Sequence, residues 1–148
     1  MDFGSLLMKN NDLADELKIK IRSIMRDHAL AKFGDTLSNF IYSLAKTKAY
    51  SKPKGERVFD KALAEAVRNA KLRFLMPSSS SAGDLGDGAE ALIGYAYLNE
   101  IISIEEMVEL ILPLFEEIKE VDFTSKGIER NLMISTFTML LIEIINRF

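Results

Sequence analysis

The strongest constraint on the fold is a helical hydrophobic period that runs through most of the chain. Apolar residues recur every three or four positions from Leu13 to Met25 and again from Leu30 to Leu44. No alternation of apolar and polar residues extends beyond four positions, so the pattern does not predict a sheet. The chain has 148 residues, 48% of them hydrophobic, which is enough for one domain with a buried core. We therefore predict a single all-α domain, residues 1–148, with roughly five to seven helices.

Polar segments divide this period into separate helices. The segments 46–55 and 77–83 are rich in Lys, Ser, Pro and Gly, and they predict loops. Further helices are expected over 57–74, 84–99 and 125–146, and another begins after Ser103, where Ser103 and Glu106 have capping-box spacing. Pro113 is expected to kink or split that helix. The last helix is apolar around most of its circumference, which is typical of a helix central in a core or buried in a subunit interface.

The composition limits the chemistry that the chain can perform. There is no cysteine and only one histidine, His28. This excludes a disulfide framework, thiol nucleophiles and multi-histidine metal sites within one chain. Carboxylates are therefore the candidate catalytic groups.

Two places in the sequence carry such carboxylates. Asp35 lies mid-helix beside Gly34, and a glycine there indicates close approach by another element. Asp84, Asp87 and Glu90 are spaced three apart and share one face of a helix. Mg²⁺ prefers such hard oxygen ligands, with water completing its shell. The alternative is that these acids only complement the dipole of the helix that they begin.

Two segments resemble the signatures of a known family. Leu30-Ala-Lys-Phe-Gly-Asp-Thr-Leu37 is similar to the ribonuclease III signature L-E-F-L-G-D-A-x-L. Residues 86–98, Gly-Asp-Gly-Ala-Glu-Ala-Leu-Ile-Gly-Tyr-Ala-Tyr-Leu, match its second signature, A-D-x-x-E-A-x-I-G-x-x-Y-L, more closely. The resemblance is strongest over residues 10–122, and 123–148 would add a C-terminal helix. It implies the ribonuclease III-like helical endonuclease fold and Mg²⁺-dependent cleavage of double-stranded or structured RNA by a homodimer.

The resemblance also assigns site residues. Asp35, Asp87 and Glu90 would be the catalytic acids and the ligands of Mg²⁺, for which Mn²⁺ may substitute. The family's glutamate four positions before Asp35 is here Ala31, so Asp84 is the candidate replacement ligand. The small single-domain branch, mini-ribonuclease III, also has alanine there, and this chain resembles that branch. No double-stranded-RNA-binding domain is expected.

The charge is unevenly distributed along the chain. Residues 1–76 have 15 Lys and Arg against 9 Asp and Glu, whereas residues 77–148 have 4 against 13. A basic surface suits duplex RNA, which proteins hold mainly through its phosphates and 2′-hydroxyl groups. We expect RNA contacts from Lys48, Lys52, Lys54, Arg68 and Lys71. The alternative is an ordinary solvated helix face and a polar loop.

The expected dimer follows from the two strands of a duplex, since each subunit offers only one carboxylate cluster. We expect the helix around Gly34 to pack against its symmetry mate. We expect the last helix to supply apolar interface residues, namely Phe137, Leu140, Leu141 and Ile144. The N-terminus, residues 1–4, has no basic region followed by an apolar run, so we expect a cytoplasmic protein without a membrane partner.

Two other functions remain open from the sequence. One is a catalytically weak or silent ribonuclease III-like protein that binds structured RNA, which the alanine at position 31 favours. The other is a helical dimerisation module without an RNA role. If Asp35 lies close to Asp87 and Glu90, the nuclease and the silent RNA-binding protein are favoured over the dimerisation module.

Overall fold

The computed structural model describes residues 13–148; residues 1–12, which include the N-terminal segment considered for targeting, lie outside the described part. The helices in chain order are α2 (Asp15–Met25), α3 (His28–Tyr50), α4 (Asp60–Asn69), α5 (Ala82–Leu98), α6 (Ile104–Glu116) and α7 (Lys126–Asn146). Two short 3-10 helices, η1 (Arg73–Leu75) and η2 (Glu120–Thr124), precede α5 and α7. The all-α prediction is confirmed, because residues 13–148 form six α-helices and no strand.

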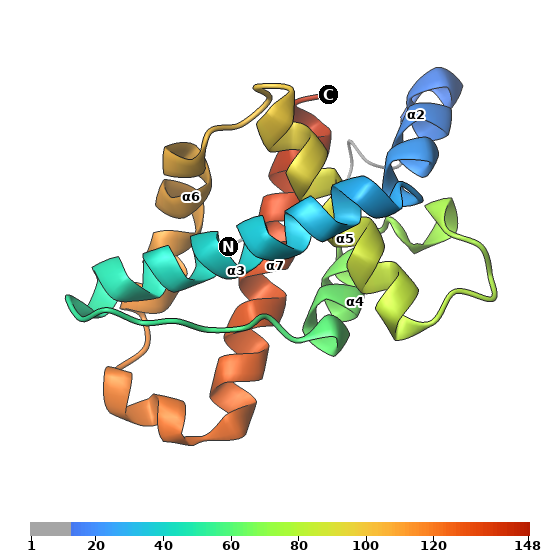
Figure 1. The fold of residues 1–148 in the computed structure, drawn as a ribbon. Helices are drawn as coiled ribbons and strands as arrows, with labels where there is room; N and C mark the ends of the chain where they lie inside the picture. The colour runs from blue at the N-terminus through green and yellow to red at the C-terminus, as the bar shows by residue number, and fades with distance from the viewer. Residues whose placement is uncertain (1–12) are drawn as a thin grey trace.

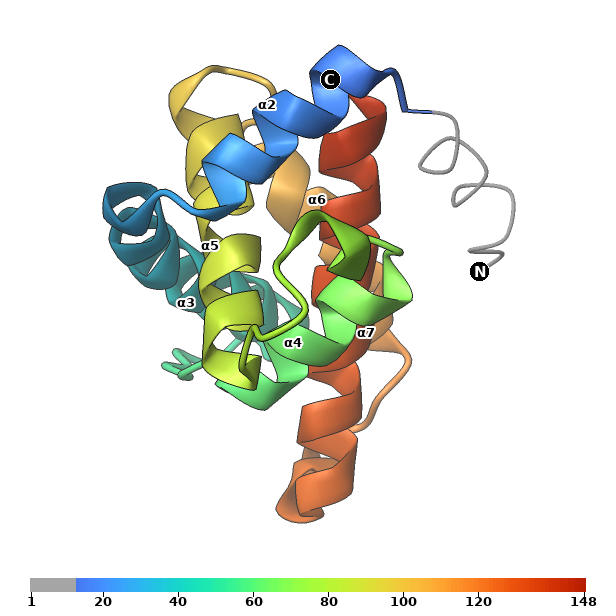
Figure 2. The ribbon, with the colours of Figure 1, turned by 90° about the vertical axis from the view of Figure 1, so that its right-hand side faces the viewer.

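Helix α5 is the centre of the arrangement. It contacts α2, α3, α4 and α7, and α3 crosses it along one side (Figure 1). Helix α7 contacts both α4 and α6, and its N-terminal part extends beyond α4 (Figure 2). Their apolar faces form one core, in which Leu92 of α5, Phe115 of α6 and Phe137 of α7 are almost fully buried. Burial of each large apolar side chain contributes about 1.5–3 kcal/mol to folding.

Helix α7 is a core helix, not an interface helix. Phe137, Leu140, Leu141 and Ile144 are at most 1% exposed within the single chain. The expectation that they supply a dimer interface is therefore wrong, because α4 and α6 already cover them. No helix within residues 13–148 is both long and apolar enough to cross a membrane.

Helix α6 differs from its sequence prediction. Its beginning is as expected, since Ser103 and Glu106 form a reciprocal capping box. Pro113 does not split it, and the helix continues unbroken to Glu116. Met107 and Phe115, on the two sides of the proline, are both fully buried. Their packing against the rest of the core holds the helix together despite the missing backbone hydrogen bond.

Candidate active site

The crossing of α3 and α5 places Asp35 beside Glu90. A β-carbon added at Gly34 would overlap the backbone carbonyl group of Glu90. Only glycine therefore allows the two helices to approach this closely. The close approach expected at Gly34 is present, but the partner is α5 of the same chain. The glycine therefore does not serve the close approach of a symmetry mate, because α5 occupies this side of α3; pairing of two copies through another side of α3 stays a prediction.

Glu90 is a buried acid with an acidic neighbour. The residue is only 4% exposed, and its carboxyl group lies in hydrogen-bond contact with that of Asp35. Burial and the nearby Asp35, Asp60 and Asp87 raise the pKa of Glu90 to about 9. At neutral pH Glu90 therefore keeps its proton. A buried carboxyl held in this way is costly unless a cation compensates it.

Asp87 and Asp60 lie at the mouth of the same site. Gly86 allows α5 to approach the start of α4, where the carbonyl oxygen of Asp60 would lie 3.4 Å from a β-carbon at Gly86. Asp87, the next residue, is exposed. Its pKa is raised by partial burial and by the charges of Asp60, Asp84 and Asp35, while His28 opposes the shift. The two acids therefore share one electrostatic environment with Glu90.

These acids line one hollow of about 280 Å³. The residues that line it are His28, Ala31, Lys32, Asp35, Arg57, Asp60, Asp87 and Glu90. We call this the carboxylate pocket. It brings together all three acids predicted to be catalytic. Its wall is more polar than apolar, which suits a hydrated ion or a phosphate better than an apolar ligand.

Asp84, the expected replacement ligand, does not line the carboxylate pocket. Its carboxylate accepts a hydrogen bond from the backbone N–H of Ser81 at 2.9 Å, and the Ser81 hydroxyl accepts one from the N–H of Asp84. This capping box begins α5. Asp60, at the start of α4, lines the carboxylate pocket instead.

Asn39 connects Asp35 to the loop that precedes α4. Its amide nitrogen donates to the Asp35 carboxylate at 3.3 Å, and its amide oxygen accepts from the N–H of Val58 at 2.8 Å. The side chain of Asp35 is thus held from one side by Asn39 and contacted from the other by Glu90. The same amide fixes the backbone two residues before Asp60.

The residue types suit Mg²⁺, but the side chains are not drawn together around an ion. Within the described residues, no group of three His, Cys, Asp or Glu side chains is close enough to hold a metal. The buried Glu90 carboxyl supports a fit, because it has only another carboxyl as its partner. Hard oxygen donors at the edge of a polar hollow are the ligands that Mg²⁺ prefers.

Comparison with known proteins decides the family. A sequence model described as Ribonuclease III matches residues 28–148, from the start of α3 through α7. The chain belongs to the ribonuclease III family. A search of the curated proteins gave no match. Membership implies a hydrolase of the endoribonuclease kind, with RNA as its substrate.

The site of this ribonuclease III family member contains residues that the sequence did not assign to it. Asp60, Arg57 and Asn39 belong to the site and were not predicted. The helix that contains Asp60 was expected to begin at Arg57, which placed Asp60 in its interior. The structure begins α4 at Asp60 instead. The regular spacing of the acids on α5 indicates a shared face, whereas no spacing in the sequence relates Asp60 on α4 to them.

None of the basic residues predicted to contact RNA lines the carboxylate pocket. Lys48 is 13 positions after Asp35 on α3, or about 20 Å along the helix axis. Lys52 and Lys54 both pair with Glu120, at 3.2 and 3.3 Å. Arg68 pairs with Glu65 at 2.7 Å, and Lys71 is exposed in a left-handed backbone conformation.

Proposed function

We propose that this chain is a Mg²⁺-dependent endoribonuclease that cleaves double-stranded or structured RNA as a homodimer. The observation that carries the proposal is the buried Glu90 carboxyl group, held against Asp35 where α3 and α5 cross. Such an acid resists ionisation, because burial and the neighbouring Asp35, Asp60 and Asp87 oppose its negative charge. It is typical of a site where a cation and an anionic substrate complete the arrangement.

Asp35, Glu90 and Asp87 would hold the ion, and Asp60 supplies the fourth carboxylate in place of Asp84. When bound, Mg²⁺ or Mn²⁺ would neutralise charge on the scissile phosphate and lower the pKa of a coordinated water. Glu90 would give up its proton on binding, because only the ionised carboxylate is a ligand. Asn39 keeps Asp35 oriented throughout.

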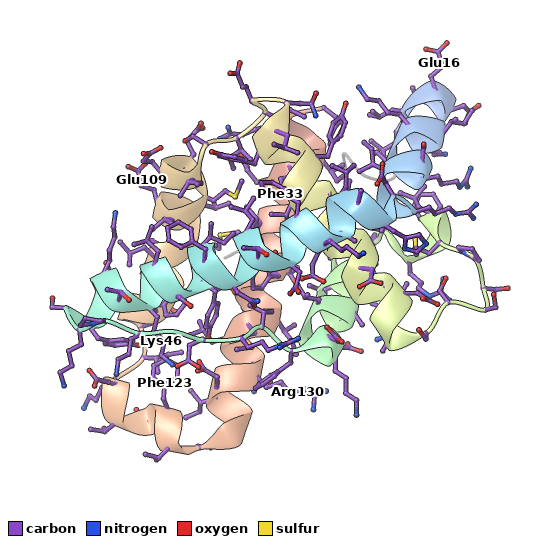
Figure 3. All side chains as sticks on the ribbon, in the orientation of Figure 1. Glu16, Phe33, Lys46, Glu109, Phe123 and Arg130 are labelled. Atoms are coloured by element: carbon purple, nitrogen blue, oxygen red, sulfur yellow. The ribbon has the colours of Figure 1, made fainter. Side chains whose placement is uncertain are left out.

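The dimer is supported by the outer face of α3. Phe33 and Phe40 are two turns apart on α3 and are 37% and 50% exposed, although the Phe33 ring also lies 6.1 Å from that of Tyr97 on α5 (Phe33 is labelled in Figure 3). Pairing two copies through this face would cover both rings and bring two carboxylate pockets towards one duplex. Sedimentation at micromolar concentration should give twice the 16.7 kDa chain mass. A monomer would rule out concerted cutting of two strands.

A cleavage assay with matched variants tests the proposal. Wild-type protein should cut an end-labelled RNA duplex with Mg²⁺ and not with EDTA. Glu90→Gln should lose at least about 100-fold in rate, the order expected for removal of a group that acts in the transition state. Asp84→Asn is the control on the same helix, because asparagine still accepts the Ser81 hydrogen bond. Equal activity of Glu90→Gln and wild type would overturn the assignment.

The silent RNA-binding protein is the second candidate. Ala31 favours it, because this residue lines the carboxylate pocket at the place where the family signature has a glutamate. RNA binding without cleavage by the wild-type chain, in Mg²⁺ or Mn²⁺, would establish it. Dimerisation without RNA binding would instead support the third candidate, the helical dimerisation module.

A further inference from the structure

A second hollow, of about 390 Å³, adjoins the carboxylate pocket and has the opposite charge. It is lined by Arg57, Val58, Phe59, Asp60, Lys61 and Arg130. Three of these side chains are cations, and they come from the loop before α4, from α4 itself and from α7. We call Arg57, Lys61 and Arg130 the basic cradle (Arg130 is labelled in Figure 3).

The basic cradle is not neutralised by the protein. None of the ion pairs among the described side chains involves Arg57, Lys61 or Arg130. All three residues are exposed. Asp60 is the single acid of this hollow, and it stands at the edge shared with the carboxylate pocket. By contrast, Lys52 and Lys54 both form ion pairs with Glu120.

A buried lysine fixes both arginines of the cradle. Lys46 is 4% exposed and pairs with Glu56 at 2.9 Å and with Glu129 at 2.6 Å. These acids are the residues immediately before Arg57 and Arg130. One cation in the core therefore holds the two backbone segments from which the arginines project (Lys46 is labelled in Figure 3).

Further hydrogen bonds lock the same two segments. The N–H of Glu56 donates to the Ser43 hydroxyl at 2.8 Å, and that hydroxyl donates to the Glu56 carbonyl at 3.2 Å. The Tyr42 hydroxyl donates to the Glu129 carboxylate at 2.6 Å. Phe123 covers the Lys46 ammonium group, whose nitrogen lies 4.2 Å from the ring centre. The cradle thus stands on a rigid base, which lowers the entropic cost of binding an anion.

We propose that Arg57, Lys61 and Arg130 bind a phosphate of the RNA backbone adjacent to the phosphate at the carboxylates. The inference rests on the proposed function and names its substrate contacts. Arg57 and Asp60 line both hollows, so a strand that reaches the carboxylates passes directly from the cradle. Guanidinium groups recognise phosphate oxygens in bidentate fashion. The cradle also offsets the repulsion between a polyanion and four clustered acids.

The hollow on the other side of the carboxylates does not offer the same recognition. It shares His28, Ala31 and Asp87 with the carboxylate pocket, but Met25 and Met76 contribute to its wall and its only Arg or Lys is Arg26. The two flanks of the site are therefore unequal, and the phosphate-binding flank is the one formed by α4 and α7.

The salt dependence of RNA binding tests the cradle. The variant is Lys61→Gln/Arg130→Gln, which leaves the carboxylate pocket intact, and the control is Lys52→Gln/Lys54→Gln, which removes the same charge. Binding of a labelled RNA duplex is measured in EDTA by fluorescence anisotropy at several salt concentrations. Each phosphate contact contributes about 0.9 to the slope of log affinity against log salt. The cradle variant should lower that slope by about 1–2 and the control by less than about 0.5.

The outcomes separate the cradle from the nuclease proposal. A cradle variant that matches the control in affinity and slope overturns the cradle, even if the wild type cleaves RNA. A cradle-dependent slope in a chain that never cleaves RNA supports the cradle and overturns the nuclease proposal. Replacing Arg130 with Lys instead of Gln, beside Lys61→Gln, should restore part of the slope of log affinity against log salt. Circular dichroism should show unchanged folding in both double variants, since the substituted side chains are exposed or only partly buried.

Discussion

The raised pKa of Glu90 predicts a specific dependence of stability on pH. A carboxyl whose pKa is higher in the folded than in the unfolded state stabilises the fold only while it is protonated. Its contribution is complete below the ordinary value of 4.5 and is lost as pH rises towards about 9. Metal-free wild-type protein should therefore become less stable across this window. Glu90→Gln keeps a neutral hydrogen-bond donor beside Asp35 at every pH, so it removes this dependence.

The magnitude follows from linkage. Between the two pKa values, each pH unit changes the free energy of unfolding by about 1.4 kcal/mol per proton. From about pH 5.5 to about pH 7.5, the wild type should lose about 3 kcal/mol more than Glu90→Gln. Because Glu90 is 4% exposed, solvent screening reduces this figure little. Titrating groups outside this cluster of acids occur in both proteins and cancel in the difference.

Urea unfolding in EDTA, followed by circular dichroism at four or so pH values, measures this difference. The variant should be close to the wild type near pH 5 and more stable near pH 8. Saturating Mg²⁺ should then recover wild-type stability and leave the variant almost unchanged, since the ion binds the folded ionised form. A difference that stays constant from pH 5 to pH 8 would refute the buried, proton-holding state of Glu90.

Three further predictions concern the framework of the site. Gly34→Ala should destabilise the protein by about 1–3 kcal/mol in urea unfolding, because α3 and α5 must separate; an unchanged midpoint would contradict the tight crossing. Lys46→Met should cost about 3–5 kcal/mol, because it leaves the Glu129 carboxylate buried without its cation; adding Glu129→Gln should recover part of that loss, and additive losses would argue against the pair. Calorimetry in buffers of different ionisation enthalpy should show that Mg²⁺ binding near pH 7.5 releases about one proton, which no release would contradict.

The sequence predicts the helices well because they are amphipathic. The period of three and four gives α2 and α5 within a few residues of their observed bounds, whereas α3 continues to Tyr50, into the segment 46–55 that was predicted as a loop. Capping boxes fix where two helices begin: Ser103 with Glu106 begins α6, and Ser81 with Asp84 begins α5. The sequence predicts Asp84 as a metal ligand, whereas its observed role is in this capping box. The fate of the last helix was not predictable in the same way. An all-round apolar helix fits a core or an interface, and only its contacts with α4 and α6 decide between them.

The site was predictable to the extent that its acids follow the family signatures. Asp35 and Glu90 come from two signature helices whose crossing brings them into contact. Asp60 follows no such pattern, because its position depends on the path of the loop 51–59. Lys46 shows the same limit. In sequence it is one cation of a basic run, yet the fold buries it between two acids from distant segments. Linear spacing carries no signal for contacts of that kind.

The identity of the cleaved ends tests the central claim most directly. If a water at the carboxylate pocket attacks phosphorus, cleavage of duplex RNA in ¹⁸O-labelled water should add one solvent oxygen to each new phosphate end. Mass spectrometry of the products should show that label with Mg²⁺ and no products with EDTA. Products that end in unlabelled 2′,3′-cyclic phosphate, or cleavage that persists in EDTA, would contradict a metal-dependent hydrolytic site built on Asp35 and Glu90.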